Sequence, residues 1–434
     1  MKFRFRQLWD NLASSLWFLP TVLVLLSMLL AIVAVWIDRQ LTNLVPFLGL
    51  APGPQASRDM LSTIASSALT VASVAFSFTI VAFSFASSQY SSRTLHSFMD
   101  DRINQIVLGT LLGSFGYCLM VLRTVPLEDN AYVPALSVTV ALVLAFVDLG
   151  LFILFIHHIT ESIQAYHIIQ KVGAVTGRAV NYLFPEGGSG PSTDSTEVER
   201  IRSDVPLREI CSTASGYVQV LESDELMRLL CKYDLQIVLH KNVGDFVSKD
   251  ECLFTAGPSE RITDKVASLL RGNFGLGPHR TISQDAQYGI LQLADIAIRA
   301  LSPAINDPNT SVMALNEIGS LLRQVARREL PDYIQRDKEG KVRIVAQGPT
   351  FESMAAQAFD QIRRYGMADA TVSTKMLNVI GEIAAETSSE VYIDVLRAHA
   401  LAIIQDANRA TSSSRDRHLL AVEIEALRAK LALK

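Results

Sequence analysis

Residues 62–87 read STIASSALTVASVAFSFTIVAFSFAS, an apolar segment that carries a Ser or Thr at nearly every helical turn. The longer stretch from Met60 to Ser92 contains no Asp, Glu, Lys, Arg or His. Such a stretch can cross the roughly 30 Å of hydrocarbon in a bilayer as an α-helix. The pattern therefore predicts a membrane-spanning helix with one hydroxylated face.

Three similar stretches surround this segment. Residues 16–37 read LWFLPTVLVLLSMLLAIVAVWI, and two later stretches lack charged side chains except for Asp148. A cleaved signal peptide is the competing interpretation of the first stretch, but its apolar run exceeds the ~7–15 residues of a signal core. The sequence predicts four spans at about residues 12–37, 61–88, 103–123 and 133–157, within a transmembrane domain of residues 1–160.

The charge distribution predicts an orientation. Four spans leave both termini on one side, and basic residues Lys2, Arg4 and Arg6 precede the first span. Positive charges flank spans on the cytoplasmic side, so we expect cytoplasmic termini, a bacterial inner-membrane location and a longer outer loop at residues 38–59. The formal net charge of −4 gives no support to a nucleic-acid partner.

The hydroxyl residues of the second span share one helical face, because steps of four and three residues stay within one stripe of an α-helix. Small residues permit close packing of helices in a bilayer. Alternatively, several copies of the stripe around one axis would line a pore. Ile80, the one apolar residue of the stripe, would then form a constriction that excludes water. The residues predicted to line such a pore are Ser66, Thr70, Ser73, Ser77, Ile80, Ser84 and Ser87.

Asp148 is the one acidic or basic residue within a predicted span and away from its ends. A carboxylate at the bilayer centre costs on the order of 3 kcal/mol on insertion scales, so it should face protein or water. Counting from Val133 gives it a depth similar to that of Arg102, at the inner start of the third span. Asp148 has two interpretations. It forms an ion pair or cap with the region around Arg102, or it is a cation or proton site along a conduit.

The rest of the chain predicts a cytoplasmic α+β region after the α-helical membrane domain. Residues 161–203 continue the last span as a helix and then contain the flexible sequence PEGGSGPSTDST. Short β-rich runs predict a small β-barrel-like subdomain at residues 204–258, with a helix at about Ser223–Lys232. Residues 259–434 have helical periodicity and predict a helical bundle.

Four polar residues of this helical region are candidate ligand contacts. Asp307 followed by Pro308 fits a helix N-cap with proline at the first helical position, so a structural corner is one interpretation. The other is a polar pocket for an ion or small molecule, formed by Gln284, Asp285, Asn306 and Asp307.

Two blocks of sequence are distinctive: residues 62–125, from STIASS to VLRTV, and residues 284–322, from QDAQYG to EIGSLL. They resemble a bacterial domain-of-unknown-function family of predicted integral membrane proteins. The resemblance covers most of the chain and is weakest near the C-terminus. It implies four spans, a large cytoplasmic C-terminal region and the bacterial inner membrane, but no particular activity.

No P-loop, GxSxG, HExxH or Rossmann glycine pattern occurs in the sequence. We therefore expect no enzyme, no cofactor and no metal site. Two functions remain open. The first is a homo-oligomeric channel for ions or small solutes, gated by its cytoplasmic domain, with the lipid bilayer and further copies as partners. The alternative is a membrane-anchored scaffold or ligand sensor without transport activity.

Overall fold

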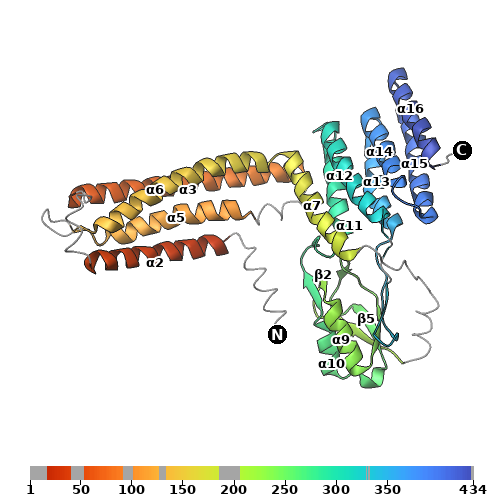
Figure 1. The fold of residues 1–434 in the computed structure, drawn as a ribbon, viewed down its shortest axis with the longest axis horizontal. Helices are drawn as coiled ribbons and strands as arrows, with labels where there is room; N and C mark the ends of the chain where they lie inside the picture. Colours follow the sequence, from red (N-terminus) through yellow and green to blue (C-terminus); the bar gives the residue numbers. More distant parts are fainter. Residues whose placement is uncertain are drawn as a thin grey trace. The chain divides into compact units, whose positions relative to one another are not determined.

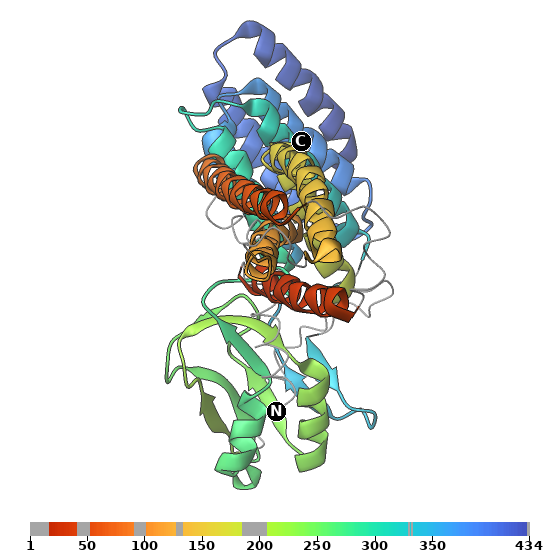
Figure 2. The ribbon, with the colours of Figure 1, turned by 90° about the vertical axis from the view of Figure 1, so that its left-hand side faces the viewer.

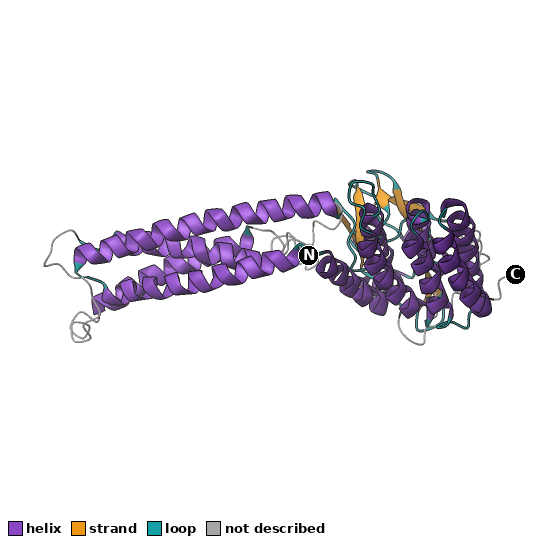
Figure 3. Ribbon diagram, turned by 90° about the horizontal axis from the view of Figure 1, so that it is seen from above, coloured by secondary structure: helices purple, strands orange, loops and turns teal. Residues whose placement is uncertain are grey.

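The computed structural model describes residues 17–40, 53–90, 101–126, 133–184, 206–328, 330 and 333–431. The chain separates into two compact units, residues 1–167 and 168–434, and each unit has hydrophobic cores of its own. Figure 3 distinguishes the helices from the strands, which belong to the second unit. The predicted linker at residues 185–196 and the first residues of the first predicted span lie outside the described residues.

The N-terminal unit is a bundle of helices that run side by side (Figure 1). The central helix, α5, is the most buried and contacts the other three, which the view from the end of the bundle also shows (Figure 2). Four described helices are long and apolar enough to cross a membrane, in agreement with the predicted spans. They are α2 (Phe18–Gln40), α3 (Pro54–Gln89), α5 (Arg102–Leu122) and α6 (Ala135–Ser162).

Glycines let α5 approach α2 closely. A Cβ atom on Gly109 would lie 2.7 Å from Cδ1 of Leu23, and one on Gly113 would lie 2.5 Å from Oγ of Ser27. Neither position has room for a side chain, which is how small residues bring membrane helices together. The glycines of the third span therefore have a packing role.

Polar contacts join the helices at both ends of the bundle. At one end, Nη1 of Arg58 in α3 donates to the carbonyl of Val125, just after α5, at 2.7 Å. At the other end, Nε2 of His158 in α6 lies 2.5 Å from Oδ2 of Asp101, the residue before α5. These contacts set α3 and α6 in register with α5.

The connection between the first two spans is shorter than the predicted residues 38–59, because α2 continues to Gln40 and α3 begins at Pro54. Proline is tolerated in the first helical turn, where its missing N–H would have no partner. The 36 residues of α3 span about 54 Å at 1.5 Å per residue, more than the hydrocarbon core of a bilayer. Arg58 and Asp59 lie in the first turns of this long helix, so they need not enter the hydrocarbon.

The C-terminal unit begins in α7 (Ala165–Leu183), which packs on helices that follow much later in the chain. Gly173 lies against the side chain of Glu317, where a larger residue would not fit. Near the end of α7, Nη1 of Arg328 donates to the carbonyl of Phe184 at 2.8 Å. The helical extension predicted after the last span is thus a structural part of the C-terminal unit.

Short strands form two open sheets in this unit. One sheet has the order β1-β5-β3-β8-β7 and the other β4-β2-β6, and within them only β3 and β8 pair in parallel. The helices α9 (Ser223–Tyr233) and α10 (Asp264–Arg271) share the hydrophobic core of the sheets, and η2 (Ser259–Arg261) is a short 3-10 turn before α10. The strands are β1 (Arg208–Cys211), β2 (Gly216–Leu221), β3 (Gln236–Leu239), β4 (Phe246–Val247), β5 (Cys252–Gly257), β6 (Phe274–Gly277), β7 (Ile334–Arg336) and β8 (Val342–Val345).

The sheets differ from the predicted β-barrel-like subdomain at residues 204–258. The described strands close no barrel, and β6, β7 and β8 come from the region predicted to be only helical. Ile237 of β3 pairs with Ile344 of β8, although a long helical region separates them in the sequence. Local periodicity cannot reveal such a pairing, because the partner strand is distant and short.

The remainder of the unit is helical, as predicted. The first two of these helices pack against each other, and most later helices pack mainly against the helix two places earlier in the chain (Figure 1). Leu420, Leu427 and Leu431 of the last helix are buried within the same chain. The helices are α11 (Ala286–Ala300), α12 (Pro308–Ala326), α13 (Phe351–Gly366), α14 (Ala370–Ala384), α15 (Glu390–Ala410) and α16 (Ser414–Leu431).

Candidate functional site

The predicted hydroxyl stripe lies on the outer surface of the bundle. Six of its residues are exposed and Ser87 is partly exposed, while an opposite face rich in alanine is buried against the other helices. Ile80 is 52% exposed. The stripe therefore does not mediate packing within its own bundle. The exposed residues are Ser66, Thr70, Ser73, Ser77, Ile80 and Ser84.

The stripe hydroxyls donate to backbone carbonyls one turn earlier in α3. Thr70 Oγ1 donates to the Ser66 carbonyl at 2.8 Å, and Ser77 Oγ donates to the Ser73 carbonyl at 2.9 Å. This arrangement satisfies the hydroxyl hydrogens of Ser66, Thr70, Ser73 and Ser77 without water. The oxygen lone pairs remain able to accept hydrogen bonds or contact a cation on the outer side.

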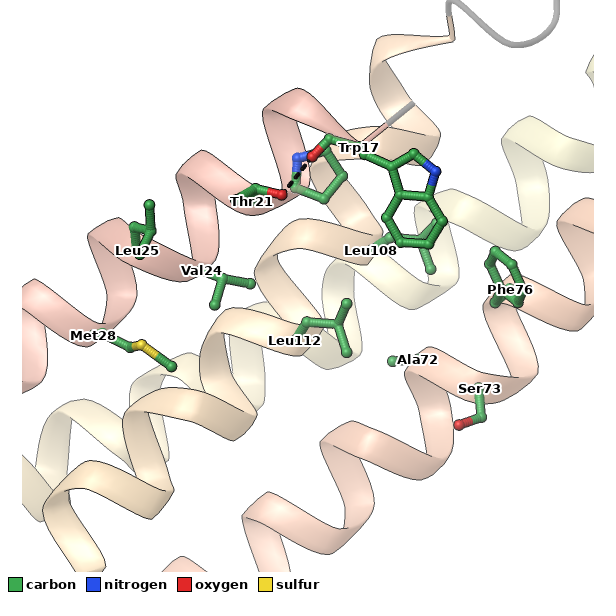
Figure 4. A pocket seen from close by; sticks show the side chains of 11 residues that line it. Trp17, Thr21, Val24, Leu25, Met28, Ala72, Ser73, Phe76, Leu108 and Leu112 are labelled. Carbon is green, nitrogen blue, oxygen red and sulfur yellow. Dashed lines mark hydrogen bonds between the residues drawn. The ribbon is translucent and has the colours of Figure 1, made fainter. Parts of the chain in front are cut away.

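An apolar groove borders the stripe (Figure 4). It has a volume of about 450 Å³ and lies over α5 between α2 and α3. Leu108 and Leu112 of α5 lie between the α2 side chains and Phe76 and Ser73 of α3 in Figure 4. An apolar groove at membrane depth suits acyl chains or the side chains of an adjacent helix.

Asp148 lies near the middle of α6, about 20 Å from either end at 1.5 Å per residue. It is only 6% exposed, and neither carboxylate oxygen has a hydrogen-bond partner. Its neighbours on α5 are Ser114, whose buried hydroxyl lies close to the carboxylate but outside hydrogen-bond geometry, and Cys118. A buried polar side chain without a partner is unusual in a folded protein and requires an explanation.

The predicted ion pair between Asp148 and Arg102 is not formed. Arg102 is exposed at the first residue of α5, and Ser114 lies about 18 Å further along the same helix at 1.5 Å per residue. Because Asp148 is beside Ser114, it is too far from Arg102. The predicted depth of Asp148 was wrong because α6 continues to Ser162, and only the last turns of α6 reach the start of α5.

A cavity of about 300 Å³ lies beside Asp148, between α3, α5 and α6. Most of its lining is apolar, but Thr63 and Ser67 contribute hydroxyls from α3. Sequence reasoning missed Ser67 and Ser114 as neighbours of Asp148. Their hydroxyls are visible in the sequence, but only the packing of three helices brings Ser114 beside Asp148 and Ser67 into the cavity wall.

The four candidate ligand residues of the C-terminal unit do not converge. Gln284 and Asp285 precede α11, whereas Asn306 and Asp307 follow it, and 15 helical residues span about 22 Å. The predicted pocket built from both pairs is therefore not formed.

These residues have local structural contacts instead. Gln284 Oε1 accepts from the backbone N–H of Leu221 at 2.9 Å. Asp285 caps α11 and lies 2.7 Å from Nη2 of Arg280; burial raises the pKa of Asp285, and the charge of Arg280 opposes that rise. Asp307 caps α12 by accepting from the Thr310 N–H at 3.1 Å, which confirms the predicted corner.

Comparison with known proteins agrees with the four apolar helices. A family described as predicted membrane protein (DUF2254) matches residues 13–382. Uncharacterized proteins of Mycobacterium bovis and Mycobacterium tuberculosis are each 30% identical over 418 residues, which is 95% of this chain and 80% of theirs. No solved structure matches the chain. Since the family match covers most of its length, the chain belongs to the DUF2254 family of predicted membrane proteins.

Proposed function

We propose that the protein is a homo-oligomeric conduit for ions or small solutes, in which α3 of each copy faces a central axis. One observation carries the proposal: α3 packs on its own bundle through alanines and presents hydroxyls on the opposite, exposed face. A bundle of four helices does not require hydroxyls on its outer surface.

The exposed face of α3 meets either acyl chains or another copy of the chain. Acyl chains gain nothing from a row of hydroxyl oxygens, and leucine or phenylalanine would contact them better. Around an axis, the same oxygens would form a lining that accepts hydrogen bonds along most of the membrane. This chemistry favours cations and solutes that donate hydrogen bonds over anions.

Ile80 is the apolar member of the stripe and is 52% exposed in the single chain. A ring of isoleucine side chains around an axis would narrow the lumen and exclude water when closed. We assign Ile80 the role of constriction.

The C-terminal unit is the proposed gate. The chain passes from Ser162 at the end of α6 to Ala165 at the start of α7 within a few residues. A movement of α7 would therefore act on α6 through a short connection. Because positive charges flank membrane spans on the cytoplasmic side, we assign this unit and both termini to the cytoplasm.

The proposal is tested by measuring solute flux across the membrane of liposomes that contain the purified full-length chain. Replacement of Ile80 by alanine should increase flux over wild type, because a smaller side chain weakens the dewetting barrier. Ile153→Ala is the matched control, since Ile153 is 61% exposed on α6 and lies outside the stripe. It should leave flux unchanged. Equal leakage from all three proteins and from empty liposomes would reject the conduit.

A second candidate is a membrane-anchored scaffold or ligand sensor. The compactness of residues 168–434, with a hydrophobic core of their own, favours it. Under this proposal, liposomes that contain wild type or Ile80→Ala show no solute flux above empty liposomes. The full chain instead binds a partner or small ligand through the C-terminal unit.

A further inference from the structure

Asp148 and the cavity beside it have features that a structural role does not explain. The Asp148 side chain is only 6% exposed, and both of its carboxylate oxygens lack a hydrogen-bond partner. Ser114, fully buried on the adjacent helix, has an unpartnered hydroxyl as well. The cavity of about 300 Å³ next to them has room for an ion with a few water molecules.

No protein group in the described bundle neutralises this carboxylate. Cys118 of α5 is the titratable side chain near it, and α3 contributes only the hydroxyls of Thr63 and Ser67 to the cavity. The charged residues of the surrounding described helices lie in the first turns, such as Arg58 and Arg102, or in the last turns, such as Arg39 and Glu161. An ionised carboxylate in a medium of low dielectric constant must be neutralised from outside the chain.

We propose that Asp148 is the carboxylate of an intramembrane binding site for a monovalent cation, a proton or Na⁺, with hydroxyl oxygens of Ser114, Ser67 and Thr63 as further ligands. One carboxylate balances one positive charge, so a divalent ion would leave an excess buried charge. Oxygen ligands of this kind suit a hard cation. Within the described residues, no group of three or more His, Cys, Asp and Glu side chains could hold a metal ion such as Zn²⁺.

The two occupants are linked by a simple exchange. A protonated carboxyl group is neutral and needs no counter-ion. When Na⁺ enters, the carboxyl proton leaves to water and the carboxylate coordinates the ion, so the net charge of the occupied site does not change. Thr63 and Ser67 are exposed on α3, which gives the occupant a polar entry from the outer surface of that helix.

The experiment uses the full-length chain in detergent and the hydrophobic reagent dicyclohexylcarbodiimide, which forms a covalent adduct with protonated carboxyl groups in apolar surroundings. Peptide mass spectrometry locates the adduct. We expect modification of Asp148 at low pH and its loss once the pH is high enough to ionise the carboxyl group. A site that also takes Na⁺ will be protected by NaCl and not by choline chloride, whereas a proton site will respond to pH alone.

Matched residues make the result specific. Asp148→Asn should remove the adduct. Asp38 is a second buried carboxylate of the same bundle, but it accepts hydrogen bonds from Leu136 and Ser137 and should not react. If Na⁺ protects, Ser114→Ala should raise the NaCl concentration needed for protection several-fold, whereas Thr79→Ala, on α3 outside both the stripe and the cavity, should leave it unchanged.

Two results would overturn the site. One is the absence of any adduct on Asp148 over the whole pH range. The other is an adduct whose yield depends neither on pH nor on Na⁺, because such a carboxyl group is permanently protonated. The labelling requires no flux, so this inference can hold even if the conduit is rejected, and it can fail while the conduit stands.

Discussion

The carboxylate of Asp38, near the end of α2, accepts hydrogen bonds from both the backbone N–H and the hydroxyl of Ser137, at 2.8 Å and 2.6 Å. Its other oxygen accepts from the N–H of Leu136 at 3.0 Å. Asp38 is fully buried and lies at the N-terminus of α6, where the helix dipole favours negative charge. Asp148, in the same bundle, has none of these partners.

Removal of the Asp38 carboxylate should destabilise the bundle. We expect Asp38→Ala to lower the free energy of unfolding by about 2 kcal/mol, because two N–H groups at the start of α6 lose their acceptor. Asp38→Asn keeps one acceptor oxygen and should lose less. Thermal unfolding in detergent, followed by circular dichroism, measures both. Asp59→Ala is the control, since Asp59 makes an exposed hydrogen bond to Gln55; equal stability of all variants would contradict the prediction.

The contact between α2 and α5 should not tolerate a methyl group. In Gly109→Ala the new Cβ would lie 2.8 Å from the backbone Cα of Pro20, so the helices must separate at a cost of about 1–3 kcal/mol. Gly150→Ala in α6 adds the same methyl group where no atom lies within 4 Å. That control should be neutral or slightly stabilising, because alanine has the higher helix propensity. The ratio of folded to unfolded protein after heating distinguishes the two variants; similar losses for both would refute the packing argument.

Asp307 should behave as a helix cap. Asp307→Ala should lower the stability of the C-terminal unit by about 1 kcal/mol, and Asp307→Ser should restore most of it, because serine also accepts a hydrogen bond at this position. Asn306 has a φ angle of +48°, so Asn306→Gly should be tolerated without loss. Chemical unfolding monitored by fluorescence tests all three. A stable Asp307→Ala protein would show that the cap contributes little.

Glu386 should make the C-terminal unit sensitive to acid. Arg327 and Arg323 lower the pKa of Glu386 from 4.5 to about 2, and their nitrogens lie 2.7 Å from its two oxygens. A lowered pKa contributes stability above the unfolded value of about 4.5, and this contribution is lost as the pH falls toward 2. The stability difference between wild type and Glu386→Gln should therefore be present at neutral pH and shrink over that window.

The size of this effect is modest because the ion pairs are near the surface. Glu382→Gln provides the comparison, since Glu382 approaches Arg323 only to 3.7 Å. Melting temperatures of the variants at several pH values test the prediction. A difference between wild type and Glu386→Gln that does not change with pH would exclude the ion pairs as its cause.

Several local features were predictable from the sequence because their causes are local. The apolar spans follow from composition, and the N-cap of α12 follows from Asp307 before Pro308. The β-barrel-like subdomain was not found, because β8 joins the sheet from a distant part of the chain. The polar pocket was not formed, because α11 separates its expected halves.

The sequence alone determined that the first part of the chain crosses a membrane and that α3 carries a hydroxylated face, since hydrocarbon length and helical periodicity act residue by residue. Only the tertiary structure decided which way that face points and what surrounds Asp148. Both depend on which helices α5 contacts, and in this bundle that choice rests on contacts such as Gly113 with Ser27 and Asp38 with Ser137, between residues far apart in the chain. Neither of these two residue contacts can be predicted from one segment of the sequence alone.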